Sequence, residues 1–131
     1  MNAPSGFSAY LSRNFTNNME QAEFLEKNVF TDLKNLNDGF DKKENLHFNE
    51  WDFAIVLDRA EYYGLSIYEI QAWHEGVLYD TAHHEPVRKK ATDAAWYKKA
   101  LMTFSTRQPG MTFTASLKVS PKLLARQMKG E

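Results

Sequence analysis

Cysteine is absent from this chain of 131 residues. Its absence excludes a disulfide framework, a thiolate metal site and a thiol nucleophile. No apolar run in the sequence approaches the roughly 18–20 residues that a membrane-spanning helix requires. The first residues also lack the basic and apolar segments of a signal peptide. We therefore expect a soluble cytoplasmic protein that has no membrane partner.

Catalytic signatures are missing as well. The sequence contains no G-x-S-x-G nucleophile motif, no glycine-rich phosphate loop and no dinucleotide-binding fingerprint. Carboxylate pairs such as Asp52 and Asp58 occur, but nothing in the sequence defines a substrate cleft around them. We expect a non-enzymatic protein without a cofactor.

Three histidines, His74, His83 and His84, lie close together in the sequence with Asp80 between them. Zinc accepts imidazole and carboxylate ligands. The H-E-x-x-H spacing is absent, however, and the adjacent His83 and His84 should diverge on an extended segment. We expect these histidines to be exposed or to cap helices, without a bound metal. A metal-dependent enzyme that uses all three histidines is the alternative.

Apolar residues are frequent enough to build one core. Hydrophobic residues make up 43% of the chain and aromatic residues 14%, which argues against global disorder. A chain of this length fits one domain. We predict a single compact domain over residues 16–131, preceded by a flexible or docked N-terminal arm over residues 1–15.

Helices are predicted from capping residues and from apolar spacing. Asn17 and Asn49 are candidate N-caps, each followed three residues later by an acidic residue, and Ser66 with Glu69 has the capping-box pattern. Proline suits the first turn of a helix, which places Pro86 and Pro121 at helix starts. The five predicted helices cover residues 17–36, 49–64, 66–76, 86–101 and 120–128.

Residues 111–119 show a different period, because apolar and polar side chains alternate there without a break. Such alternation is typical of a strand with one buried face. Pro109 and Gly110 suit a tight turn before it, so residues 102–106 are the expected partner strand. The predicted fold is α+β and mostly helical, with about five helices and a small antiparallel β-hairpin near residues 102–119.

A local pattern over residues 59–73 joins a small residue, a glycine four positions later and three apolar residues: Ala60, Gly64, Leu65, Ile70 and Trp73. It resembles the helix-turn-helix unit of phage repressors and related DNA-binding proteins. The resemblance implies a DNA-binding unit over residues 56–75. It also implies a second helix whose exposed residues, Ser66, Tyr68 and Gln71, face the major groove. A plain helical corner is the alternative, since that segment carries acidic rather than basic residues.

Charge is divided sharply along the chain. Residues 1–85 carry fifteen Asp and Glu against six Lys and Arg, whereas residues 86–131 carry two acidic against ten basic residues. A split of this kind favours an oriented encounter with a charged partner. The alternative is that the two halves fold against each other, so that their charges interleave in space.

The basic third of the chain predicts nucleic-acid binding. Lysines beside aromatic rings neutralise phosphates and offer surfaces on which bases stack. The residues concerned lie on one predicted helix: Arg88, Lys89, Lys90, Trp96, Lys98 and Lys99. The other interpretation is that the lysines only solvate the helix while Trp96 packs in the core.

The acidic part predicts a different function. Its carboxylates could dock a basic surface of another protein, as in an inhibitor of the phage or mobile-element type. The residues of this candidate face are Glu20, Glu23, Glu26 and Asp32. The expected partner is therefore nucleic acid or a protein of a nucleic-acid-processing complex.

Overall fold

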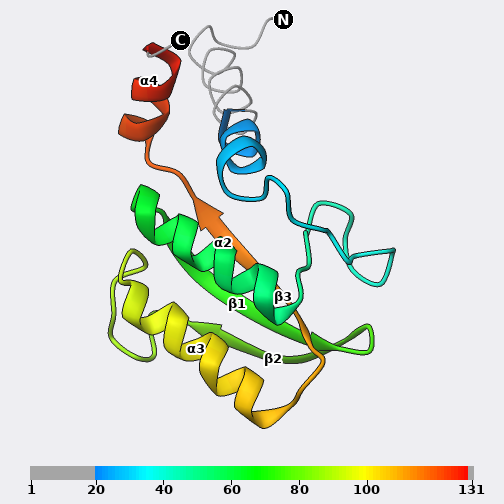
Figure 1. Cartoon of the computed structure of the whole chain (residues 1–131). Helices are drawn as coiled ribbons and strands as arrows, with labels where there is room; N and C mark the ends of the chain where they lie inside the picture. Colours follow the sequence, from blue (N-terminus) through cyan, green and yellow to red (C-terminus); the bar gives the residue numbers. More distant parts are fainter. Residues whose placement is uncertain (1–19, 130–131) are drawn as a thin grey trace, which may run out of the picture.

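Residues 20–129 are the part of the chain that the computed structural model describes (Figure 1). Within this part, four helices accompany one three-stranded antiparallel sheet. Residues 20–28 form the first helix. The other elements are, in chain order, helix α2 (Glu50–Tyr63), strand β1 (Ser66–His74), strand β2 (Val77–His83), helix α3 (Ala94–Arg107), strand β3 (Thr112–Lys118) and helix α4 (Pro121–Lys129).

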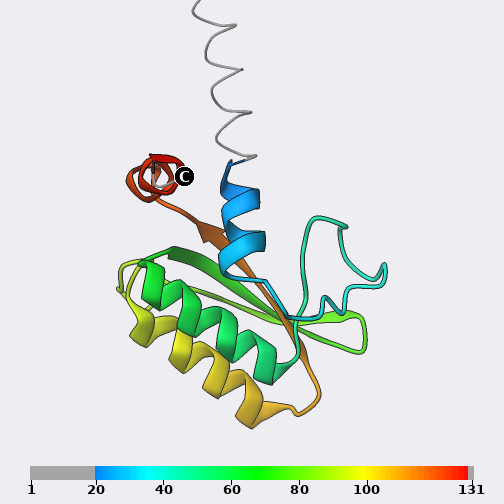
Figure 2. The same ribbon diagram turned by 45° about the horizontal axis from the view of Figure 1, so that its top comes forward.

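Strand β1 is central in the sheet, whose order is β2-β1-β3. It pairs antiparallel with both neighbours, so β2 and β3 run in the same direction on either side of it. Helix α3 makes the connection from β2 to β3. Helices α2 and α3 lie side by side on one face of the sheet (Figures 1 and 2).

Helix α2 has the ends that the sequence predicts. The side chain of Asn49 accepts a hydrogen bond from the backbone N–H of Asp52 and so caps the first turn. Gly64 ends the helix in a left-handed conformation, with φ of 66°, which glycine adopts without steric cost. The second predicted helix is thus confirmed.

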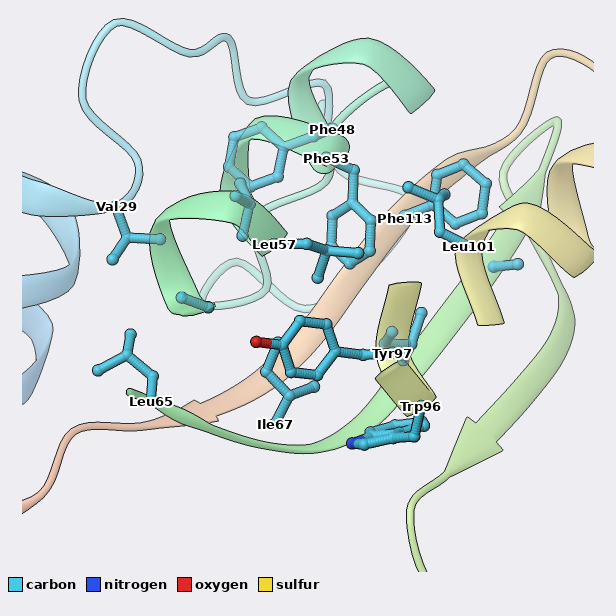
Figure 3. Close-up of a cluster of buried hydrophobic side chains, with 14 of the residues drawn as sticks. Val29, Phe48, Phe53, Leu57, Leu65, Ile67, Trp96, Tyr97, Leu101 and Phe113 are labelled. Carbon is cyan, nitrogen blue, oxygen red and sulfur yellow. The ribbon is translucent and has the colours of Figure 1, made fainter. Parts of the chain in front are cut away.

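The core lies between the two helices and the sheet (Figure 3). Phe53 of α2 stacks on Phe113 of β3, with ring centroids 5.4 Å apart. Ile67 of β1 is completely buried, as is Tyr97 of α3. Burial raises the pKa of the Tyr97 hydroxyl to about 12, and nearby Glu61 adds to the shift. At neutral pH this side chain is therefore an uncharged member of the core.

The predicted third helix over residues 66–76 is wrong, because these residues form β1 and the turn after it. A shift in register between Ile67 and Glu69 puts Ile67 and Ile70 on the same buried side. That three-residue spacing imitates a helix in the sequence. Strands on both sides satisfy the backbone of β1, so no helix-turn-helix is present at residues 56–75.

The expected strand over residues 111–119 is confirmed as β3, and Phe113 faces the core. The predicted partner strand is wrong, since residues 102–106 belong to α3 and β3 pairs with β1 instead. The prediction of about five helices with a hairpin near residues 102–119 is therefore corrected to four helices and a three-stranded sheet within residues 20–129. The sequence favoured the nearest candidate strand, whereas the fold pairs β3 with residues 39 to 52 positions earlier, from Trp73 with Thr112 to Ser66 with Lys118.

Two predicted helix boundaries are also corrected. Helix α3 starts at Ala94, capped by Asp93, and Pro86 lies in the turns before it. The first helix ends at residue 28 rather than 36. The closing helix at Pro121 is confirmed as α4, while Asn17 and the arm over residues 1–15 lie outside the described residues. No helix within residues 20–129 combines the length and apolar character needed to cross a membrane.

Candidate functional site

A groove of about 470 Å³ lies between the edge strand β2 and helix α3. Its walls come from Asp80 to His83 of β2, from the loop that carries Val87 and Lys89, and from one face of α3. Its volume falls within the range of about 300–1,000 Å³ that is usual for ligand sites.

Three cationic side chains line this groove: Lys89, Lys99 and Arg107. Lys99 and Arg107 are two helical turns apart on α3 and so share a face. Arg107 Nη1 lies 3.2 Å from Asp80 Oδ2, the one carboxylate among the lining residues. Neither lysine amine makes an ion pair within residues 20–129. The groove therefore carries a net positive charge.

The loop between β2 and α3 positions Lys89. The Nδ1 of His84 donates a hydrogen bond of 2.8 Å to the Lys89 carbonyl, because a carbonyl oxygen can only accept. The Lys89 N–H donates in turn to the His84 carbonyl, at 3.2 Å. Between them, Arg88 adopts a left-handed conformation with φ of 56°, which closes the turn. This paired bonding fixes the backbone from which the Lys89 side chain extends into the groove.

The floor of the groove is apolar and includes Trp96, Ala100 and Phe104 of α3. Trp96 is 5% exposed and lies next to Tyr97 in the core (Figure 3). Its ring centroid is 6.3 Å from that of His84 and 6.1 Å from that of Tyr97. A ring this buried leaves no free face for base stacking. Trp96 thus forms part of the packed floor of the groove. Its burial does not favour the predicted role as a platform for base stacking.

The residues predicted to bind nucleic acid fall into separate places in the structure. Lys89, Trp96 and Lys99 come together in the groove, while Arg88 and Lys90 are exposed on the same loop outside its lining. The prediction that all of them share one helix is wrong, because α3 begins after residue 93.

Lys98 belongs to the other side of α3. Its amine lies 3.2 Å from Asp58 and 2.5 Å from Glu61, both on α2. Hydrogen bonds to Glu61 and then to Asp58 raise the pKa of Lys98. Together with the Arg107–Asp80 pair, this contact shows that part of the charge split along the chain interleaves in space.

The residues assigned to a recognition helix lie on strand β1 instead: Ser66, Tyr68 and Gln71. The Gln71 amide donates to Glu69 at 2.9 Å and its oxygen accepts from Trp73 Nε1 at 3.0 Å. A side chain engaged within its own strand in this way does not read bases from a helix.

The acidic residues of the alternative prediction lie near the start of the described chain. Glu20, Glu23 and Glu26 are on the helix of residues 20–28. Asp32 follows in a left-handed conformation with φ of 66°. Glu23, Glu26 and Asp32 are exposed, which is also the ordinary state of carboxylates on a helix surface.

The three clustered histidines have separate partners. His74 Nε2 lies 3.4 Å from the Gln108 amide, His83 Nδ1 lies 3.6 Å from Glu69, and His84 bonds to Lys89. Within residues 20–129, no group of three or more His, Asp or Glu is arranged to hold a metal ion.

Sequence reasoning missed His83 as a groove residue, and it included Arg107 only as one of the later cations that could extend the basic patch. The signal for Arg107 was its spacing of eight residues from Lys99, which would have placed both on one face had the helix been extended past residue 101. His83 gave no such signal, because its place depends on the pairing of β2 with β1.

Comparison of the chain with protein-family models, with curated proteins and with solved structures gave no significant match.

Proposed function

We propose that this protein is a non-enzymatic cytoplasmic module that binds single-stranded nucleic acid through the groove between β2 and α3. The observation that carries the proposal is the convergence of Lys89, Lys99 and Arg107 on one groove with an apolar floor. Cations neutralise successive phosphates and release their counterions, which supplies affinity without sequence preference. Val87, which lines the groove and is exposed, offers an apolar surface against which a base or sugar can lie.

A single strand suits this site better than a duplex. Reading a duplex requires an element that enters the major groove, and the segment predicted to do so is the central strand of a sheet. The site is instead a local groove whose volume suits a short stretch of an unpaired chain. We therefore expect binding that tolerates sequence and depends strongly on salt.

The test is a salt titration of binding to a labelled single-stranded oligonucleotide, followed by fluorescence anisotropy. Each neutralised phosphate contributes about −0.7 to the slope of log K against log salt. Three groove cations should give a slope of about −2, so affinity should fall roughly twentyfold between about 50 and 200 mM salt. Replacing Lys89 and Lys99 together by alanine should reduce the slope to about −0.7.

A matched control is available in the connector before α2. Lys42 and Lys43 are exposed and lie outside the groove. Replacing both by alanine removes the same charge, and it should leave the slope and affinity nearly unchanged. Equal effects of the two double variants, or no binding by the wild type near 50 mM salt, would contradict the proposal. Binding of a mononucleotide as tight as that of the oligonucleotide would indicate a small-molecule site instead.

A further inference from the structure

Helix α2 exposes a row of side chains that the core does not use. Residues 51, 55, 58 and 62 are spaced by four, three and four positions and therefore lie on one helical stripe. Trp51 is 81% exposed and Tyr62 is 82% exposed, with Ile55 between them. Large aromatic side chains at this exposure are uncommon on a free surface and are enriched at binding hot spots.

A second groove, of about 510 Å³, runs beside this stripe between α2 and α3. Its floor includes Leu57 and Leu101, which are buried, and Met102 on its α3 side is 69% exposed. The side-chain oxygen of Ser105 is buried there without a hydrogen-bond partner among the described residues. Two helices that lie side by side and leave an apolar groove between them can receive a third, amphipathic helix along that groove.

The charge around this groove is acidic. Glu50 and Asp58 line it, and Asp52 and Glu61 lie on the same helix, while Lys98 is the only cation among the lining residues. Lys98 is already held by Asp58 and Glu61. The only cation of α2, Arg59, donates from Nη1 to the carbonyls of Val29 and Thr31, at 2.9 and 2.8 Å, and so does not line this groove.

We propose that the exposed stripe of α2 and the groove between α2 and α3 form a docking site for a basic amphipathic helix of a partner protein. The apolar face of that helix fills the groove over Leu57 and Leu101 and contacts Trp51. Its lysines or arginines meet Glu50 and Asp58. The α3 residues of this groove and those of the basic groove lie on different faces of the helix, so one molecule can engage both ligands.

The experiment uses the whole chain and a synthetic amphipathic peptide of about 18 residues built from Leu and Lys, long enough to be helical. Binding is measured by calorimetry, and the site is mapped by amide chemical shifts. We expect the peptide to bind, and a peptide with Glu in place of Lys not to bind. Trp51→Ala should weaken binding at least about tenfold, and shifts should concentrate on α2 and the facing side of α3.

Matched variants distinguish binding at this site from nonspecific electrostatic attraction between the peptide and the protein. Tyr62→Ala should weaken binding severalfold, whereas Tyr79→Ala, which removes an exposed tyrosine from β2, should not. Glu50→Gln with Asp58→Asn should weaken binding, whereas neutralising the exposed Asp38 and Glu44 should not. Absence of binding, equal effects within either matched pair, or shifts outside α2 and α3 would overturn the proposal. So would self-association that Trp51→Ala abolishes, because the occupant would then be a second copy of this chain.

Discussion

His47 has no exposed surface, although imidazole is polar. Its Nε2 donates to Asp41 Oδ2 at 2.7 Å, and its Nδ1 lies 3.1 Å from Thr112 Oγ1. This Thr–His–carboxylate row has the order of a catalytic triad, but a fully buried imidazole offers no access to a substrate. We assign it to holding the connector before α2 against β3, where Phe40 and Trp73 also contact the imidazole ring.

The Asp41 carboxyl gives the fold a dependence on pH. Burial raises its pKa, but hydrogen bonds from His47, from the Lys42 N–H and from Asn45 outweigh burial and lower the pKa below its usual value. A lowered pKa stabilises the fold above the unfolded pKa of about 4, and this stability is lost as the pH falls through the folded pKa. Asp41→Asn should therefore reduce the free energy of unfolding at pH 7 by about 1–3 kcal/mol.

Urea denaturation of wild type and Asp41→Asn across the acidic range measures this effect. The difference between the two should be full at neutral pH and should narrow below about pH 4. Asp38→Asn is the control, since Asp38 is exposed nearby and should change stability by less than about 0.5 kcal/mol. A difference for Asp41→Asn that stays constant down to about pH 2 would contradict the assigned role.

Helix α2 shows how far local sequence decides an element. Its cap, its glycine end and its apolar face, with Phe53, Val56 and Leu57 buried, are all encoded within sixteen consecutive positions. The same local rules failed at β1, because the Ser66-to-Glu69 capping pattern and the Ile67–Ile70 spacing both suit a helix. Pairing with β2 and β3 overrides that preference, since each partner satisfies one edge of the β1 backbone.

The Asn49 cap provides the prediction at this scale. Asn49→Ala leaves the Asp52 N–H without its partner at 2.8 Å and should lower the free energy of unfolding by about 1 kcal/mol. Asn49→Asp keeps an acceptor oxygen at the cap and should stay within a few tenths of a kcal/mol of wild type. Thermal and urea denaturation of the two variants checks this. Equal destabilisation by both would show that the amide nitrogen, rather than the cap oxygen, is what matters.

For the whole molecule, helix α3 separates two grooves of opposite charge. Lys99 lines the basic groove against β2, whereas the adjacent Lys98 lines the acidic groove against α2. The basic and acidic parts of the sequence thus correspond to a basic groove on one face of α3 and an acidic groove on the other. Only the Lys98 and Arg107 ion pairs connect the basic third to the acidic half among the described residues.

These neighbouring lysines allow a direct comparison. Lys99→Ala should reduce the salt slope of single-strand binding by about 0.7, because one phosphate contact is lost. Lys98→Ala should leave that slope unchanged and should strengthen binding of the basic peptide, because Asp58 and Glu61 lose their cation. Anisotropy and calorimetry on the two single variants measure both quantities. Identical slopes for the two variants would contradict the separation of the grooves.

The sequence by itself determined the features that depend on neighbouring residues. These are the caps and length of α2, the alternation that makes β3, the start of α4 at Pro121, and the α+β class. It also determined that Lys89, Trp96 and Lys99 were candidates for one site. Such features follow from local backbone preferences and from the spacing of apolar residues, both of which are set by residues close together in the sequence.

Tertiary structure alone decided the rest. Residues 66–74 became a central strand because partners from residues 77–83 and 112–118 complete its hydrogen bonds. His47 is buried because the fold brings it against Thr112, which lies 65 positions further along the chain. The two grooves exist because α3 packs between α2 and the edge strand, so Lys98 and Lys99 acquire different surroundings. Long-range pairing of this kind leaves no period in the sequence from which it could be inferred.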